Sequence, residues 1–216
     1  MTNRFQTAST HWVPAARMPD WPQSEVHLWR IDLRTAPTNT SVLSPDEQAR
    51  PARFQQTRSL LRTLLGHYSS QPPQSLRFDY GTSGKPSFSP HPAGKILHFN
   101  LSHADEMALI AISASAEVGV DVERIRSVGH AQKIARRFFT AKDLSWLEEE
   151  PSEERFFQAW TRTEARLKSR GRGVFTTSSE ATPVSVLNID AQVGYAAAVA
   201  VHGEMPILRF WEWKPE

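Results

Sequence analysis

The stretch VGVDVERI, residues 118–125, constrains the fold because an apolar run carries two acids separated by a single valine. The alternation predicts a β-strand, whose period of two places the valines on one face and Asp121 and Glu123 together on the other. Strand neighbours at i and i+2 lie about 6–7 Å apart, close enough to repel each other or to hold one cation between them. The pattern therefore predicts a buried valine face and a positive partner for the acids.

A third acid occupies an unexpected position in SEERFFQAWTRTEARLKSRG, residues 152–171, which predicts a helix. Glu164 follows Trp160 by four residues and precedes Leu167 by three, so helical spacing puts it on the apolar stripe, which we expect to face the core. A carboxylate there is costly unless it is paired. An ion pair with Lys168 contributes only about 0.3–0.5 kcal/mol, so a cation shared with the strand acids is the stronger explanation.

Asp121, Glu123 and Glu164 form an all-oxygen set, and a chain without cysteine offers no thiolate alternative. Such a set suits Mg²⁺, which keeps several waters and takes phosphate oxygens from a substrate. The alternative is that the strand acids face solvent and pair with Arg124 and Arg126, as in a structural or interaction protein.

The formal charge is only +2, but the basic residues are unevenly distributed. Residues 51–100 hold six bases against one acid, and five more bases surround Glu164 between Arg162 and Arg172. These blocks are either solvated faces or a concave site for a polyanion such as a phosphorylated cofactor. No recognised nucleic-acid motif accompanies them, so we expect no nucleic-acid partner.

Several further residues have both a structural and a functional explanation. Arg58 lies on the apolar side of its predicted helix, either with its charged end extended towards solvent or bound to a phosphate. Lys85 and Pro86, in the GKP turn at 84–86, present a lysine that is either exposed or directed into a site. Ser102 and His103 end a predicted strand, where they are either structural or turned toward a cleft.

The remaining pattern predicts an α+β protein of two related subdomains, residues 1–115 and 116–216, because each half contains helical segments followed by strands. A capping box at Ser44-Pro45-Asp46-Glu47 begins a short helix that Pro51 interrupts. We expect a hairpin between 107–113 and 118–123. Helices are expected at 53–68, 128–139, 141–149 and 153–169, and strands at 25–33, 77–80, 85–88, 95–101, 107–113, 118–123, 184–189, 195–201 and 207–213.

The absence of cysteine favours a reducing compartment, and the N-terminal residues contain no apolar leader. No apolar run approaches the roughly 18 residues that a membrane span requires. We therefore expect a cytoplasmic protein that does not bind membranes.

Taken in order, GKP (84–86), FNLSH (99–103), VGVDVE (118–123) and FFQAWTRTEARLK (156–168) resemble the larger, Sfp-type 4'-phosphopantetheinyl transferases. The resemblance covers roughly residues 50–175 and implies two similar α/β subdomains related by a pseudo-twofold axis. It also implies a monomer with coenzyme A bound between these subdomains. It implies Mg²⁺ ligands at Asp121, Glu123 and Glu164, with Lys168 on the cofactor phosphates. It also implies contacts with the adenine, 3'-phosphate and pyrophosphate from Arg58, Lys85, Pro86, Ser102 and His103.

The resemblance further implies transfer of phosphopantetheine from coenzyme A to a serine of an apo acyl or peptidyl carrier protein, with release of adenosine 3',5'-bisphosphate. Glu164 and Lys168 would be the catalytic residues. Arg136 and Arg137 lie in a basic region that could dock an acidic carrier. Thr163 stands where many members have lysine, and this departure leaves a non-catalytic coenzyme A or nucleotide binding module as the alternative.

Overall fold

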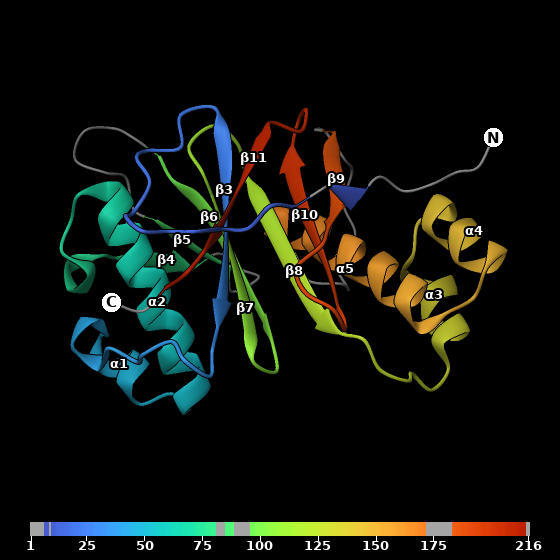
Figure 1. Cartoon of the computed structure of the whole chain (residues 1–216), viewed down its shortest axis with the longest axis horizontal. Helices are drawn as coiled ribbons and strands as arrows, with labels where there is room; N and C mark the ends of the chain where they lie inside the picture. Colours follow the sequence, from blue (N-terminus) through green and yellow to red (C-terminus); the bar gives the residue numbers. More distant parts are fainter. Residues whose placement is uncertain (1–6, 9, 81–84, 89–95, 172–182, 215–216) are drawn as a thin grey trace.

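The computed structural model describes residues 7–8, 10–80, 85–88, 96–171 and 183–214. The described chain is α+β, as the sequence predicts, and has four layers (Figure 1). Helix α2 (Ala52–Ser69) covers a five-stranded sheet, a four-stranded sheet follows, and helix α5 (Glu153–Ser169) covers its outer face. The shorter helices are α1 (Pro45–Gln48), α3 (Ala131–Phe138), α4 (Ala141–Glu149) and the 3-10 turns η1 (Thr40–Val42) and η2 (Pro73–Ser75).

The two main sheets are mostly antiparallel. The order in the first is β2 (Val13–Pro14), β11 (Ile207–Glu212), β3 (Glu25–Asp32), β7 (Met107–Ser113) and β6 (His98–Ala104). The order in the second is β1 (Thr7–Ala8), β9 (Val184–Ile189), β10 (Tyr195–His202) and β8 (Val118–Arg124). Strands β4 (Phe78–Tyr80) and β5 (Pro86–Phe88) form a separate pair. Only β11 with β2 and β3, and β1 with β9, run parallel among these described pairs.

The predicted valine face lies in the core between the two sheets. Val118, Val120 and Val122 are buried there against Leu28 and Leu109 of the five-stranded sheet. The opposite face of that sheet packs on the leucines of α2 in a second cluster. Because side chains alternate between the two faces of a strand, the acids of β8 point away from its valines, towards the side of the sheet that α5 covers.

The predicted helix boundaries at the start of the chain are confirmed. Ser44 caps α1 in a reciprocal capping box with Glu47, and Pro51 separates α1 from α2. Asn39 caps the preceding 3-10 turn in the same manner, by accepting from the backbone of Ser41. The first helical segment is therefore set by local hydrogen bonds that short polar side chains can make.

The predicted hairpin between residues 107–113 and 118–123 is wrong. Strand β7 pairs with β3 and β6, whereas β8 pairs with β10 in the other sheet. The Ser113 side chain accepts hydrogen bonds from the backbone of Ser115 and Ala116, which bends the chain out of one sheet and into the next. The hairpin forms one strand earlier, between β6 and β7.

Each end of the chain contributes a strand to the sheet that is formed mainly by the other predicted subdomain. Strand β11 lies inside the five-stranded sheet, between β2 and β3, although its sequence position belongs to the second half. Strand β1 reaches the four-stranded sheet and pairs with β9. The division into 1–115 and 116–216 thus separates most strands but does not describe either end, because each sheet takes a strand from the other half.

No helix among the described residues is long and apolar enough to span a membrane.

Candidate active site at the junction of the two sheets

Side chains join the edge strands β6 and β8. The Asn100 side-chain oxygen accepts the Val120 N–H at 2.9 Å, and the Ser102 hydroxyl accepts the Val122 N–H at 3.4 Å. The backbone of β6 does not take these donors, and Asn100 and Ser102 are both buried. The motif FNLSH therefore satisfies the free edge of β8 and holds the two sheets together at that point.

Asp121 lies at the centre of this junction with 3% of its surface exposed. Its Oδ1 accepts the Ser102 hydroxyl at 2.8 Å and the Lys168 ammonium at 2.6 Å. Lys168 also donates to the Ser102 oxygen at 2.9 Å, so the three polar groups form a closed ring. Burial raises the pKa of the Asp121 carboxyl, and Lys168 and Ser102 offset part of that effect.

Direct packing of α5 on β8 brings Glu164 and Lys168 to this point. A Cβ on Gly119 would lie 2.1 Å from the Ala165 carbonyl oxygen and 2.4 Å from the Ser169 nitrogen. The helix face that meets the sheet is small, with Ala165 against the alanines of β10. Glycine in VGVDVE therefore sets the helix-to-strand distance.

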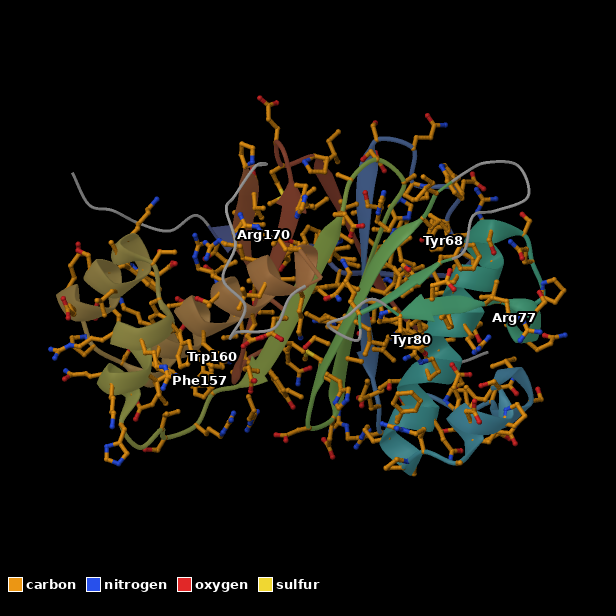
Figure 2. The ribbon with its side chains drawn as sticks, turned by 180° about the vertical axis from the view of Figure 1, so that it is seen from behind. Tyr68, Arg77, Tyr80, Phe157, Trp160 and Arg170 are labelled. Atoms are coloured by element: carbon orange, nitrogen blue, oxygen red, sulfur yellow. The ribbon has the colours of Figure 1, made fainter. Side chains whose placement is uncertain are left out.

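The predicted core-facing stripe of α5 is fully buried only at its N-terminal end. Phe156 and Phe157 are buried under α3 and α4, while Trp160 and Leu167 are only partly buried. The stripe thus enters the core through its two phenylalanines, while small residues such as Ala165 pack directly on the sheet. Figure 2 shows Phe157 and Trp160 near the N-terminal half of α5 and Arg170 at its C-terminal end. Glu164 lies beside the sheet-facing side, where it is half-buried.

The three acids influence one another electrostatically. Burial raises the pKa of Glu164, the negative charge of Asp121 raises it further, and Lys168 opposes both, while Glu123 adds a smaller upward effect. Glu123 accepts a hydrogen bond from Arg126 at 3.1 Å. A strand and a helix distant in sequence therefore place these acids near enough to affect one another's charge. One predicted alternative, the pairing of Glu123 with Arg126, is also present.

The acid cluster fits a divalent cation in its chemistry. Its donors are all carboxylate oxygens, and Asp121 Oδ2 is buried without a hydrogen-bond partner. Within the described ranges, however, no three His, Asp or Glu side chains lie close enough together to hold a metal ion. Two of the three carboxylates are turned instead to Lys168 and Arg126.

Arg53 adds a positive charge near the junction, although it belongs to none of the sequence motifs. Burial lowers the pKa of His103, and the positive charges of Arg53 and Lys168 lower it further. Arg53 begins α2 and was noted only as part of the basic block. No spacing rule within its helix connects it with His103, because His103 lies on a different element, β6.

Lys85 occupies a different position in the same interface, near the start of β8. Its ammonium donates to Glu117 at 2.8 Å and to the carbonyls of Val118 at 3.2 Å and Ser169 at 3.4 Å. Glu117 also contacts His98 Nδ1 at 3.1 Å. Pro86 follows on β5 and lines a pocket with Lys85 and His98. Lys85 is thus a tie between β5, β8 and α5 rather than an exposed turn lysine.

Arg58 lies apart from Lys168 and from the three acids of the junction. It is buried between the rings of Phe54 and Phe78 and lies 3.5 Å from Glu47 of the capping box. Burial lowers its pKa, partly offset by Tyr80 and Glu47. Its Nη1 has no hydrogen-bond partner, and Arg58 lines a separate pocket with Arg77 and Tyr80. Figure 2 labels Arg77 and Tyr80 on the α2 side of the molecule. The helical spacing that placed Arg58 on the buried side is confirmed.

Thr163 is buried, and its hydroxyl donates to the Ala159 carbonyl one turn earlier at 3.0 Å. The side chain therefore bonds within its own helix. Gly84, the first residue of the predicted GKP turn, lies outside the described residues.

Comparison with known proteins supplies the family. Residues 117–212 match the model of the 4'-phosphopantetheinyl transferase superfamily. The chain is 35% identical over 179 residues to the 4'-phosphopantetheinyl transferase HetI of Nostoc sp., covering 76% of each protein. It is 34% identical over 165 residues to the putative 4'-phosphopantetheinyl transferase slr0495 of Synechocystis sp., covering 71% of this chain and 67% of the relative. Both the extent and the level of identity show that the chain is an enzyme of the 4'-phosphopantetheinyl transferase superfamily.

Proposed function

We propose that the enzyme transfers the 4'-phosphopantetheine group of coenzyme A to a serine of an apo acyl or peptidyl carrier protein, with Mg²⁺, and releases adenosine 3',5'-bisphosphate. The observation that carries the proposal is the junction of β6, β8 and α5. There, on the α5 side of β8, the acids affect one another electrostatically and lie beside the Lys168 ammonium and the cations around His103. A site with both signs of charge suits a metal-bound pyrophosphate.

Asp121, Glu123 and Glu164 are the residues that would hold the ion. Bound there, Mg²⁺ would neutralise and align pyrophosphate oxygens for displacement at phosphorus. Asp121 has a buried free oxygen for this purpose, and Glu123 would exchange Arg126 for the ion.

Lys168 and the residues around His103 would bind the phosphates of coenzyme A. Lys168 has a partly exposed side chain and would balance the charge that develops on the leaving pyrophosphate oxygen. Arg53 on α2, and Ser102 and His103 on β6, would hold the remaining phosphate oxygens. Lys85 and Pro86 would contribute from β5, and Arg58 from the neighbouring pocket.

Glu164 is the proposed general base. Its raised pKa brings the carboxylate closer to the pH at which proton transfer is efficient. The serine oxygen of the carrier would form a bond to the β-phosphorus as its proton passes to Glu164. The bond between that phosphorus and the bridging oxygen breaks, and the oxygen leaves with adenosine 3',5'-bisphosphate.

The carrier protein would approach along α3. This helix presents Arg136 and Arg137 in its last turn, and Lys133 lies exposed one turn earlier. Such a surface complements the acidic surface typical of carrier proteins. We propose that the enzyme acts as a monomer in the cytoplasm, on the basis of its internal pair of sheets and its lack of cysteine.

The test is to incubate the enzyme with Mg²⁺, coenzyme A and a panel of apo carrier proteins, and to measure the intact mass of each carrier. We expect one or more carriers to gain a single phosphopantetheine group on serine. Binding of coenzyme A without a mass change on any carrier would instead support a non-catalytic binding module.

A further inference from the structure

The positive charge next to Asp121 belongs to the chain itself. Lys168 Nζ lies 2.6 Å from Asp121 Oδ1, and Ser102 holds both groups from the strand opposite. An ammonium at contact distance from a buried carboxylate supplies the charge that a bound cation would otherwise supply. Asp121 is thus already neutralised in the described structure.

The other acids of the junction are also not arranged as a metal cage. Glu123 is paired with Arg126, and the described residues contain no group of three potential ligands within reach of one ion. The free Asp121 Oδ2 shows, however, that one ligand atom is buried and has no partner. The junction therefore holds a potential ligand that a side chain of α5 blocks electrostatically.

We propose that Lys168 is an internal counter-ion that keeps divalent cations out of the junction until phosphates draw its ammonium away from Asp121. This inference rests on the proposed function, because the phosphates are those of coenzyme A. Lys168 is suited to such a move, since its side chain is 29% exposed and ends on a flexible four-carbon stem. The Lys168 ammonium and a divalent cation repel each other at the same carboxylate. Binding of coenzyme A should therefore strengthen metal binding, and metal binding should strengthen binding of coenzyme A to the same extent.

The inference differs from a purely structural role for the ion pair. A structural pair that loses its lysine leaves a buried, uncompensated carboxylate, and the protein is destabilised whatever ions are added. An internal counter-ion that is removed leaves a site that a divalent cation can fill. The Lys168→Met variant should then be rescued by metal in a way that the wild type is not.

The experiment measures Mn²⁺ binding by electron paramagnetic resonance, and thermal unfolding with EDTA or Mg²⁺, in protein free of coenzyme A. We expect Lys168→Met to bind Mn²⁺ about tenfold more tightly than wild type or better, in line with a charge removed at contact distance. Its unfolding temperature should rise with Mg²⁺ more than that of wild type. Lys168→Arg, which keeps the charge, should bind Mn²⁺ as weakly as wild type.

Two controls show where the effect arises. Lys133→Met removes an exposed positive charge from α3 and should leave the Mn²⁺ affinity within about twofold of wild type. Asp121→Asn combined with Lys168→Met should abolish the tight binding. Folded Lys168→Met that binds Mn²⁺ no more tightly than wild type would overturn the inference.

Addition of coenzyme A separates this inference from the proposed function. We expect coenzyme A to tighten Mn²⁺ binding by wild type about tenfold, and by Lys168→Met much less, because the competing ammonium is already gone. If Lys168→Met binds Mn²⁺ tightly but no carrier protein is modified by wild type, the proposed function fails and the counter-ion stands. If carriers are modified but Lys168→Met shows no gain in affinity, the counter-ion alone fails.

Discussion

Asp121 illustrates how a single buried charge depends on residues far apart in the sequence. Its partners are Ser102 on β6 and Lys168 on α5, and its neighbours on β8 are valines that face the other way. A carboxylate in that position requires hydrogen bonds and a positive charge. The chemistry of the junction therefore depends on three elements that meet only in the folded chain.

The first prediction concerns the acids. Asp121→Ala and Glu164→Ala should each lower the rate of transfer by about 10²-fold or more, because each removes a proposed ligand or base rather than packing. Circular dichroism should show that both variants fold, and the rate is measured by mass gain of the carrier. Glu204→Gln, an exposed acid, is the control. Near wild-type rates in both alanine variants would rule out the metal and base assignments.

The second prediction concerns Glu117, which ties Lys85 to the start of β8. Burial pushes its pKa up, but hydrogen bonds from His98 and Lys85 outweigh this and lower the pKa to about 2, from 4.5 for an exposed glutamate. The folded-state pKa is depressed, so the stabilisation is complete above about pH 4.5 and is lost as the pH falls toward 2.

Glu117→Gln should therefore lower the free energy of unfolding at pH 7 by about 1 kcal/mol, a value that allows for the partial exposure of the carboxylate. The difference from wild type should shrink between pH 4.5 and pH 2, as measured by urea unfolding. Glu149→Gln, on the exposed side of α4, should show no such pH dependence. An equal difference at every pH would contradict the ion-pair explanation.

At the scale of elements, the contact of α5 with β8 sets the spacing of the site. Gly119→Ala should destabilise the enzyme by about 1–3 kcal/mol or more, because the new methyl group meets helix backbone that cannot rotate away. Gly129→Ala is the matched control, since nothing lies within 4 Å of its added Cβ. Thermal unfolding measures the stability of both variants. The Mn²⁺ affinity shows whether the distance between α5 and β8 has changed. Similar stability of the two variants would show that the helix can shift freely.

Local patterns predict the elements well, and their partners poorly. The capping box at Ser44 and the break at Pro51 depend on neighbours within a few residues, and both are present. The hairpin after β7 was wrong because Ser113 and Ser115 suit a tight turn and a bend between sheets equally well. A turn composition does not specify which edge the next strand will meet.

The same limit applies to the site. Alternation on β8 placed Asp121 and Glu123 together, but the sequence alone could not show that Glu123 would pair with Arg126 or Lys85 with Glu117. Alanine and serine of α5 pack on the sheet, although neither belongs to the apolar stripe that the sequence shows. Small residues bury little surface, so hydrophobic periodicity does not detect them.

At the scale of the whole molecule, the two sheets form one unit. Arg30 of β3 donates to the Ala191 carbonyl beside β9 and pairs with Glu212 of β11 at 3.1 Å. The inner faces share a continuous apolar cluster, and each sheet contains a strand from the other end of the chain. Neither sheet has a complete core without the other.

We therefore predict one cooperative unfolding transition. Calorimetry should give a calorimetric enthalpy equal to the van't Hoff enthalpy, and fluorescence of the tryptophans should change at the same temperature as circular dichroism. Trp29 and Trp211 report the five-stranded sheet, while β9 and β10 contribute no tryptophan. Two resolved transitions would indicate that the halves fold independently.

The exchange of strands also decides how the enzyme could be divided. A break in the bend after Ser113 would leave one fragment without β11 and the other without β1. Mixed together, the fragments could restore each other's missing strand and recover the junction that neither contains alone. The protein is thus suited to reconstitution from two separately produced halves, with activity as the signal that they have met.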